Sequence, residues 1–155
     1  MATLVDIIRF VNVFTAAITC GGLVMVGMAV YPAMKTFQPV ITAQMHRAID
    51  LLPDAYMRPS TVTSTVSAIL LLLLRSHLTP ASTALTAVGL LGSLGVILDS
   101  EFFNVPINRI VHSWSYDYAP PEYPQMLARW GRFHWVRTTC SLVALSCYLI
   151  AAIVE

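Results

Sequence analysis

Four apolar stretches divide the sequence, and polar residues or prolines separate them. They cover residues 10–31, 59–75, 78–101 and 134–154. A helix needs about 20 apolar residues to cross the hydrocarbon core of a bilayer. The second stretch is short, so its helix would have to recruit the preceding turn or thin the bilayer locally. The pattern predicts an all-α integral membrane protein, a four-helix bundle that forms a single transmembrane domain over residues 1–155.

Two longer polar connections are predicted to lie on the same side of the membrane. Residues 35–58 include an amphipathic segment, residues 44–52, which predicts a short interfacial helix between the first and second spans. Residues 113–123 are rich in proline and tyrosine and predict a loop. Most Lys and Arg residues flank these connections, so the positive-inside rule places both in the cytosol.

Three glycines recur at every third position of the third span, at Gly89, Gly92 and Gly95. Small residues allow helices to approach closely in lipid. This stripe predicts helix packing, either within the bundle or between protomers, and it is compatible with a homo-oligomer.

The composition supports a membrane location and excludes some partners. The chain is 57% hydrophobic and only 11% charged, whereas soluble domains average about 25% charged residues. The net charge of +1 and the lack of a basic block argue against nucleic-acid binding. We therefore expect a multi-pass protein in the lipid bilayer, in an endomembrane such as the endoplasmic reticulum if the source is eukaryotic.

Polar residues gather where the third span ends. With helical spacing i, i+3, i+7 and i+11, four of them share one face: Glu101, Asn104, Asn108 and His112. Such groups are costly near hydrocarbon and need partners or a function. Pro106 lies among them and predicts that the helix kinks, or ends and restarts.

A second polar face leads into the last span, with spacing i, i+4, i+7 and i+11: Trp130, His134, Arg137 and Ser141. Successive membrane helices joined by one loop run antiparallel, so the two faces should lie at the same depth and meet. Glu101 or Asp99 is the expected partner of Arg137, which would otherwise be unpaired near hydrocarbon.

The histidines raise the alternative of a metal site. His46, His112 and His134, with Glu101 or Asp99, would be an acceptable ligand set. They come from separate segments without a metal-binding spacing, so no metal is assigned. A metal-dependent membrane oxidase stays an alternative. Another is a non-catalytic four-helix subunit that binds lipid or a partner protein, in which the polar faces only hold helices together.

The motifs at the third and fourth spans resemble those of a known family. Residues 103–108 read Phe-Asn-Val-Pro-Ile-Asn, residues 128–130 read Ala-Arg-Trp and residues 134–137 read His-Trp-Val-Arg. This arrangement resembles the anthrone oxygenase family of small four-helix membrane proteins. The family pattern is Asn-x-Pro-x-Asn, then Trp, then a polar residue with Arg three positions later. These positions are taken by Asn104, Pro106, Asn108, Trp130, His134 and Arg137.

The resemblance implies an oxygenase of polyketide metabolism. Its reaction would convert a polyketide anthrone, or a similar electron-rich aromatic, to the anthraquinone with dioxygen and without flavin or metal. The partners would be a small aromatic polyketide and O₂. Such chemistry needs a base, a group that stabilises the anion, and a dry, flat pocket.

The resemblance also implies roles for particular residues. The base would be one of three histidines: His134, His112 or His46. The developing oxyanion would be held by Arg137, Asn104 and Asn108. The aromatic faces would be covered by Trp130, Trp135 and Tyr116. Glu101 and Arg109 complete the predicted substrate-binding set.

Overall fold

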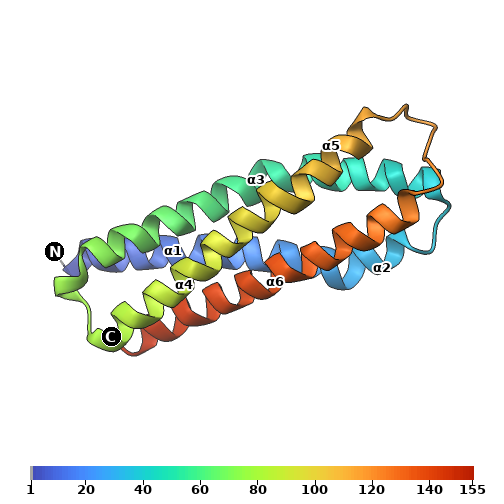
Figure 1. Ribbon diagram of the computed structural model, residues 1–155. Coiled ribbons are helices and arrows are strands. Elements are labelled where there is room, and N and C mark those ends of the chain that lie inside the picture. Colours follow the sequence, from blue (N-terminus) through green and yellow to red (C-terminus); the bar gives the residue numbers. More distant parts are fainter. Residues whose placement is uncertain (1) are drawn as a thin grey trace.

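The computed structural model describes residues 2–155, apart from the side chains of residues 2–3, 52–54 and 75. Within that range every regular element is a helix (Figure 1), which confirms the all-α prediction. The first half consists of α1, the π-helical turn η1, the short α2 and the long α3 (Ala2–Met25, Val26–Val30, Tyr31–Met34 and Pro39–Leu73). The second half consists of the 3-10 turn η2, α4, the π-helical turn η3, α5 and α6 (Arg75–His77, Pro80–Asp99, Ser100–Asn104, Val105–Ser113 and Tyr123–Ile153).

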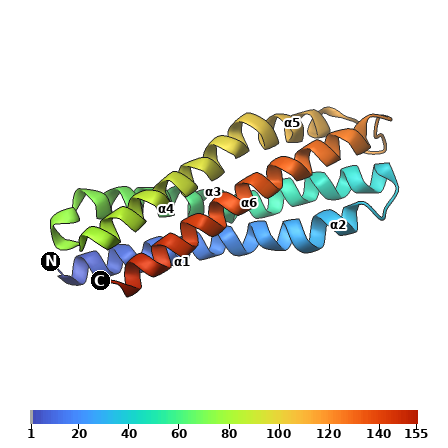
Figure 2. The same cartoon turned by 60° about the horizontal axis from the view of Figure 1, so that its bottom comes forward.

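The long helices pack side by side around a common interior. Helix α1 contacts α3 and α6, and α4 contacts α6 and α3, an arrangement that is visible in two views (Figures 1 and 2). Both chain ends lie with the α3–α4 connection at one end of the molecule. The α2–α3 and α5–α6 connections lie at the opposite end, which we call the loop end. Both long connections therefore share one end, as the sequence predicts.

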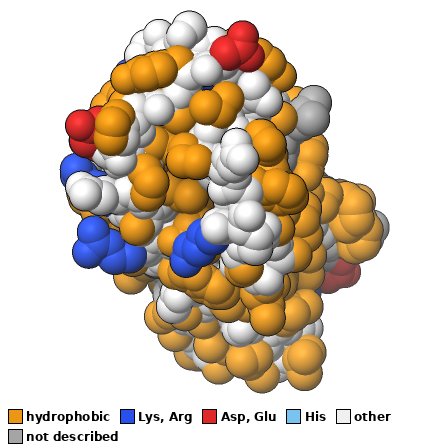
Figure 3. Space-filling view, turned by 90° about the vertical axis from the view of Figure 1, so that its right-hand side faces the viewer, with side chains coloured by type: hydrophobic (Ala, Val, Ile, Leu, Met, Phe, Trp, Pro, Cys, Tyr) orange, Lys and Arg blue, Asp and Glu red, His pale blue; other side chains and the backbone are white. Residues whose placement is uncertain are grey.

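The surface is that of a membrane protein. Among the described residues, three helical stretches are long and apolar enough to cross a membrane: Leu4–Met34, Pro80–Ser113 and Tyr123–Ile153. Large apolar side chains on all three are exposed, such as Phe10, Leu91 and Ile153, and lipid would cover them. Figure 3 looks onto the loop end, where Lys and Arg side chains lie among apolar ones. The four-helix membrane bundle, with a fourth span at residues 59–75 in the second half of α3, stays a prediction.

Helix α3 differs from the sequence-based expectation. Residues 44–52 do not form a separate interfacial helix, because they and residues 59–75 share one continuous helix up to Leu73. Pro59 was expected to begin the second span but lies inside α3. A proline in a helix leaves the carbonyl four residues earlier without its donor. Here that residue is Ala55, and both Ala55 and Pro59 are exposed, so the deprived carbonyl lies on the outer surface rather than in the core.

Two π-helical turns interrupt the membrane helices, and a proline follows each of them. Val105 N–H donates to the Ser100 carbonyl at the end of η3, and Pro106 follows. Tyr31 N–H donates to the Val26 carbonyl at the end of η1, and Pro32 follows. A proline ring crowds the carbonyl of the preceding turn, and a wider i→i+5 turn moves that carbonyl aside. The predicted interruption at Pro106 is therefore confirmed, and its form is a π-helical turn.

The glycine stripe of α4 packs against α6 within the molecule. A Cβ added to Gly92 would lie 2.8 Å from the carbonyl oxygen of Cys140. A Cβ added to Gly89 would lie 2.4 Å from Cε1 of Tyr148. The predicted packing role is confirmed, and its partner is a helix of the same chain.

Candidate active site

A cavity of about 220 Å³ lies inside the helices, beside both π-helical turns. Its wall includes apolar side chains from four sides, such as Leu23, Val26, Ile49, Val96 and Val105. The polar part of the wall consists of Thr19, Asp50, Arg58, Thr61, Ser100, Glu101, Asn108, His134 and Arg137. The volume is below the roughly 300–1,000 Å³ of sites for drug-sized ligands, so the cavity suits a small molecule.

Arg137 and His134 form one polar wall on α6. The guanidinium Nε and one terminal nitrogen of Arg137 lie 3.2 Å and 2.9 Å from Nδ1 of His134. On its other side, His134 Nε2 lies 2.9 Å from the carbonyl oxygen of Leu23. A carbonyl only accepts hydrogen bonds, so Nε2 carries the hydrogen and Nδ1 accepts from Arg137. His134 is thus a neutral side chain that holds a permanent cation at the cavity.

Trp130 provides the flat part of this wall. Its side chain is buried, and its ring stacks on His134 with centroids 5.0 Å apart and planes inclined by 18°. The Arg137 guanidinium carbon lies 5.8 Å from the centre of the same ring. The other terminal nitrogen of Arg137 reaches Ser100 Oγ at 3.4 Å, on η3. The cation is therefore fixed between α6 and the π-helical turn.

A chain of hydrogen bonds connects α3 with α5 on the opposite wall. Asn108 Nδ2 donates to Oδ1 of Asp50, and Oδ2 of Asp50 lies 2.8 Å from His112 Nε2. Asn108 Oδ1 accepts from His46 Nε2 at 3.0 Å. His46 Nδ1 then accepts from the hydroxyl of Tyr123 at 3.2 Å. Each member orients the next, so Asn108 is held with its amide between Asp50 and His46.

His46 is neutral at physiological pH. It lies on the part of α3 that precedes the predicted span, and its side chain is only 1% exposed. Burial lowers the pKa of His46 from 6.5 to about 4, although the hydrogen bond to Asn108 opposes the shift. Both ring nitrogens are already engaged. His46 therefore acts as a support for Asn108 and does not line the cavity.

The shifted pKa of His46 makes stability depend on pH. Between pH 6.5 and about 4 the unfolded chain binds a proton at this residue and the folded protein does not, so stability falls as pH falls. The shift corresponds to a loss of roughly 3 kcal/mol. Thermal unfolding in detergent should show a steeper loss of Tm over this range for the wild type than for His46→Gln, whose amide keeps one donor and one acceptor. His77→Gln, at an exposed turn position, is the matched control, and equal slopes for wild type and His46→Gln would contradict the assignment.

A salt bridge closes the cavity between α3 and η3. Arg58 and Glu101 lie 3.5 Å apart, and their side chains are 53% and 49% exposed. Both also line the cavity. These two side chains therefore separate the cavity from the surface of the molecule at this point. Glu101, one of the two expected partners of Arg137, pairs here with Arg58.

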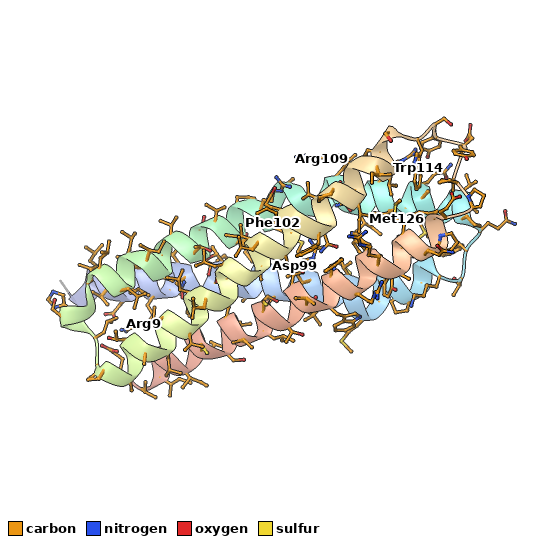
Figure 4. The ribbon with its side chains drawn as sticks, in the orientation of Figure 1. Arg9, Asp99, Phe102, Arg109, Trp114 and Met126 are labelled. Atoms are coloured by element: carbon orange, nitrogen blue, oxygen red, sulfur yellow. The ribbon has the colours of Figure 1, made fainter. Side chains whose placement is uncertain are left out.

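The structure brings only some of the predicted site residues to the cavity. Those that line it are Glu101, Asn108, Trp130, His134 and Arg137. Asn104 is buried but donates to Asp99 at 2.8 Å, and Figure 4 shows Asp99 between α4 and α6. The residues that do not line the cavity are His46, Asn104, His112, Tyr116, Trp135 and Arg109.

The residues outside the cavity have other surroundings. Tyr116 is exposed in the α5–α6 loop, where its carbonyl accepts from Gln44. Trp135 points to the outer surface of α6 and is 42% exposed. Arg109 and His112 line a separate surface hollow beside Asp50, and Arg109 is labelled in Figure 4. Their predicted substrate-binding and catalytic roles stay predictions without support from the cavity geometry.

The geometry does not favour a histidine as the base. His134 lines the cavity, but its proton-accepting nitrogen is occupied by Arg137. His46 and His112 lie behind Asn108 and Asp50 as seen from the cavity. Among the described residues, no three His, Cys, Asp or Glu side chains come together as metal ligands, so the set of His46, His112 and His134 is not assembled.

The cavity also has polar residues that were not predicted from the sequence, namely Thr19, Asp50, Arg58, Thr61 and Ser100. Of these, Asp50 had a recognisable signal. It lies four residues after His46, on the same face of α3, and both residues belong to the amphipathic segment 44–52. The signal was an acid and a histidine at i, i+4 spacing on the polar face of that segment. Treating the segment as an interfacial helix placed this face toward solvent instead of toward α5.

Fold and cavity define a helical membrane protein whose internal site combines a fixed cation, an amide and an aromatic face. The model of the family described as anthrone oxygenase matches residues 52–147, and the chain belongs to this family. The match includes Asn108, Trp130, His134 and Arg137, confirms the resemblance drawn from the motifs, and indicates an oxygenase. Comparisons with curated proteins and with solved structures give no match.

Proposed function

We propose that this protein oxidises an anthrone, or a similar electron-rich aromatic with an acidic methylene, to the quinone with dioxygen inside the cavity. The observation that carries the proposal is the position of Arg137, which His134 and Ser100 hold against the face of Trp130 at the cavity wall. A fixed cation beside a flat ring suits an aromatic molecule that becomes an anion. The family supports oxygenase chemistry.

The reaction balances without a reductant. A base removes one proton from the methylene, and the electron pair stays on the substrate as a conjugated oxyanion. That anion reduces dioxygen, a carbon–oxygen bond forms, and the resulting peroxide takes up a proton. Loss of the second methylene proton, with cleavage of the oxygen–oxygen bond, leaves one oxygen atom as the new carbonyl and the other as water. The substrate supplies all the electrons.

The protein lowers the barrier mainly by stabilising the anion. The guanidinium of Arg137 stabilises the oxyanion, and Asn108 provides a second polar group at the cavity. Trp130 covers one face of the aromatic system. Low-dielectric surroundings strengthen the attraction between the guanidinium and the anion. His134 acts as a positioning residue, since its Nδ1 fixes the orientation of Arg137.

The membrane setting fits this chemistry. An aromatic polyketide and dioxygen both partition into lipid, so a site among membrane helices meets both at raised concentration. We propose a multi-pass four-helix bundle, in an endomembrane if the source is eukaryotic, with residues 59–75 as the fourth span. The short span would need local thinning of the bilayer, which is possible at modest cost.

The direct test is the conversion of anthrone by purified protein in detergent under oxygen-18 gas. We expect anthraquinone with one labelled oxygen atom, formed well above the rate in protein-free buffer, and one equivalent of oxygen consumed per product. Mass spectrometry and an oxygen electrode measure both quantities. Folded protein that adds nothing to the spontaneous rate would overturn the proposal and favour a non-catalytic membrane subunit.

A further inference from the structure

We propose that Asp50 is the catalytic base of this site, the group that takes the methylene proton from the substrate. The inference rests on the proposed function and assigns its missing proton acceptor. Two carboxylates line the cavity among the described side chains, Asp50 and Glu101. Glu101 is about half exposed and pairs with Arg58. Asp50 is held more firmly, by hydrogen bonds to Asn108 and His112 of α5.

Asp50 is oriented by two donors on α5. Asn108 Nδ2 donates to Oδ1, and His112 Nε2 lies 2.8 Å from Oδ2. Each carboxylate oxygen has two lone-pair sites, so these contacts leave capacity to accept a proton. They also fix the carboxylate, since Asn108 and His112 lie one helical turn apart and hold one oxygen each. A base must lie within hydrogen-bond reach of the proton that it removes, and a substrate bound in the cavity would meet this carboxylate at the wall.

The surroundings of Asp50 also lower the cost of its charge. The cavity lies on one side, and a surface hollow of about 340 Å³ lies on the other, lined by Asp50, Arg58, Asn108, Arg109 and His112 among others. The side chain of Asp50 is 24% exposed. Contact with solvent on the hollow side reduces the desolvation penalty of a carboxylate. The same wall thus supports a charged base facing an otherwise largely apolar cavity.

The proton step balances within the reaction. The methylene carbon–hydrogen bond breaks, its proton moves to an Asp50 oxygen, and its electron pair enters the conjugated anion next to Arg137. Protonated Asp50 then returns the proton to the peroxide formed with dioxygen. The ionised carboxylate takes the second methylene proton when the oxygen–oxygen bond breaks. Both protons leave in the one water molecule that is produced.

The test uses Asp50→Asn in the full-length protein, with anthrone as substrate. We expect kcat to fall by about 10²–10⁴-fold, the usual contribution of a general base. Anthraquinone binding, followed by quenching of tryptophan fluorescence, should change by less than about threefold, because Asn keeps the shape of the side chain. Asp50→Glu should retain part of the activity. Asp117→Asn, at an exposed loop position, is the control and should match the wild type.

Chemical rescue guards against a variant that merely fails to fold. Asp50→Ala leaves a gap that opens to the surface hollow, so added formate should restore turnover in this variant and not in Asp50→Asn. Unchanged kcat in Asp50→Asn would overturn the assignment, as would a larger loss in Glu101→Gln. These outcomes are distinct from failure of the proposed function, in which the wild type itself would not convert anthrone.

Discussion

Replacement of Arg137 by lysine is expected to lower kcat for anthrone oxidation by about 10²–10³-fold, the usual effect of removing an oxyanion-stabilising group. Lysine keeps the positive charge but loses the planar fork that contacts His134 Nδ1 and Ser100 at the same time. The charge would then no longer be fixed at the cavity wall. Initial rates of anthraquinone formation at saturating anthrone measure the effect.

The control for this variant is Arg132→Lys. Arg132 lies on the same helix, is exposed and does not line the cavity, so its replacement should leave kcat within about twofold of the wild type. A rate for Arg137→Lys similar to that of Arg132→Lys would show that the oriented guanidinium is not required, and the proposed stabilisation of the anion would then be wrong.

Replacement of Gly92 by leucine is expected to destabilise the whole helical assembly. Even a single Cβ at this position would lie 2.8 Å from the Cys140 carbonyl oxygen and 3.1 Å from the backbone nitrogen of Ala144. Backbone atoms cannot rotate away, so α4 and α6 would have to separate. Overpacking usually costs about 1–3 kcal/mol or more, and a larger side chain than alanine should reach the upper end. The melting temperature in detergent should fall by roughly 6–12 °C.

Gly21→Leu provides the matched control. Gly21 also lies within a long helix, but an added Cβ there meets nothing within 4 Å. Leucine has the higher helix propensity, so this variant should melt no lower than the wild type. Equal melting temperatures for the two variants would mean that α4 and α6 do not pack through this glycine.

The polar face of α6 was predicted from the sequence because that helix is regular. The positions of Trp130, His134 and Arg137 follow the spacing of an uninterrupted α-helix, and all three line the cavity. The two polar faces were also expected to lie at the same depth in the membrane. They do meet, since Asn108 and Glu101 line the same cavity from the other side. Regular periodicity thus located one wall of the site and the level at which it lies.

The predicted polar face at the end of the third span was wrong for Asn104, which does not line the cavity. The reason is that a π-helical turn lies within this face. The helical spacing of Glu101, Asn104 and Asn108 assumed α-helical geometry, but η3 covers Ser100–Asn104. The turn leaves Asn104 against Asp99, five residues earlier, while Asn108 contacts Asp50 and the cavity. Pro106 indicated an interruption, yet the side to which each residue turns depends on the kind of interruption, which sequence spacing does not specify.

The contribution of α3 could not be derived from local pattern alone. Asp50 and His46 shared a polar face that fitted either solvent or a neighbouring helix, and the choice depended on whether the helix continued through Pro53 and Pro59. In the structure, α3 runs without a break through both prolines. Hydrogen-bond roles, such as the acceptor role of His134 Nδ1, likewise require the partner atoms, because a neutral imidazole presents either nitrogen as donor.

The turn η3 has a consequence for how this site can vary among related chains. A π-helical turn holds one residue more than the α-helical turn that it replaces, and each residue of an α-helix corresponds to about 100° of rotation. If the same residues instead formed a regular α-helix with no residue lost, Asn108 and His112 would be rotated by about 100° away from Asp50. The orientation of this half of the site therefore depends on the extra residue being absorbed at η3, and related chains with one residue fewer in this segment should have a regular α-helical turn and keep the contacts to Asp50.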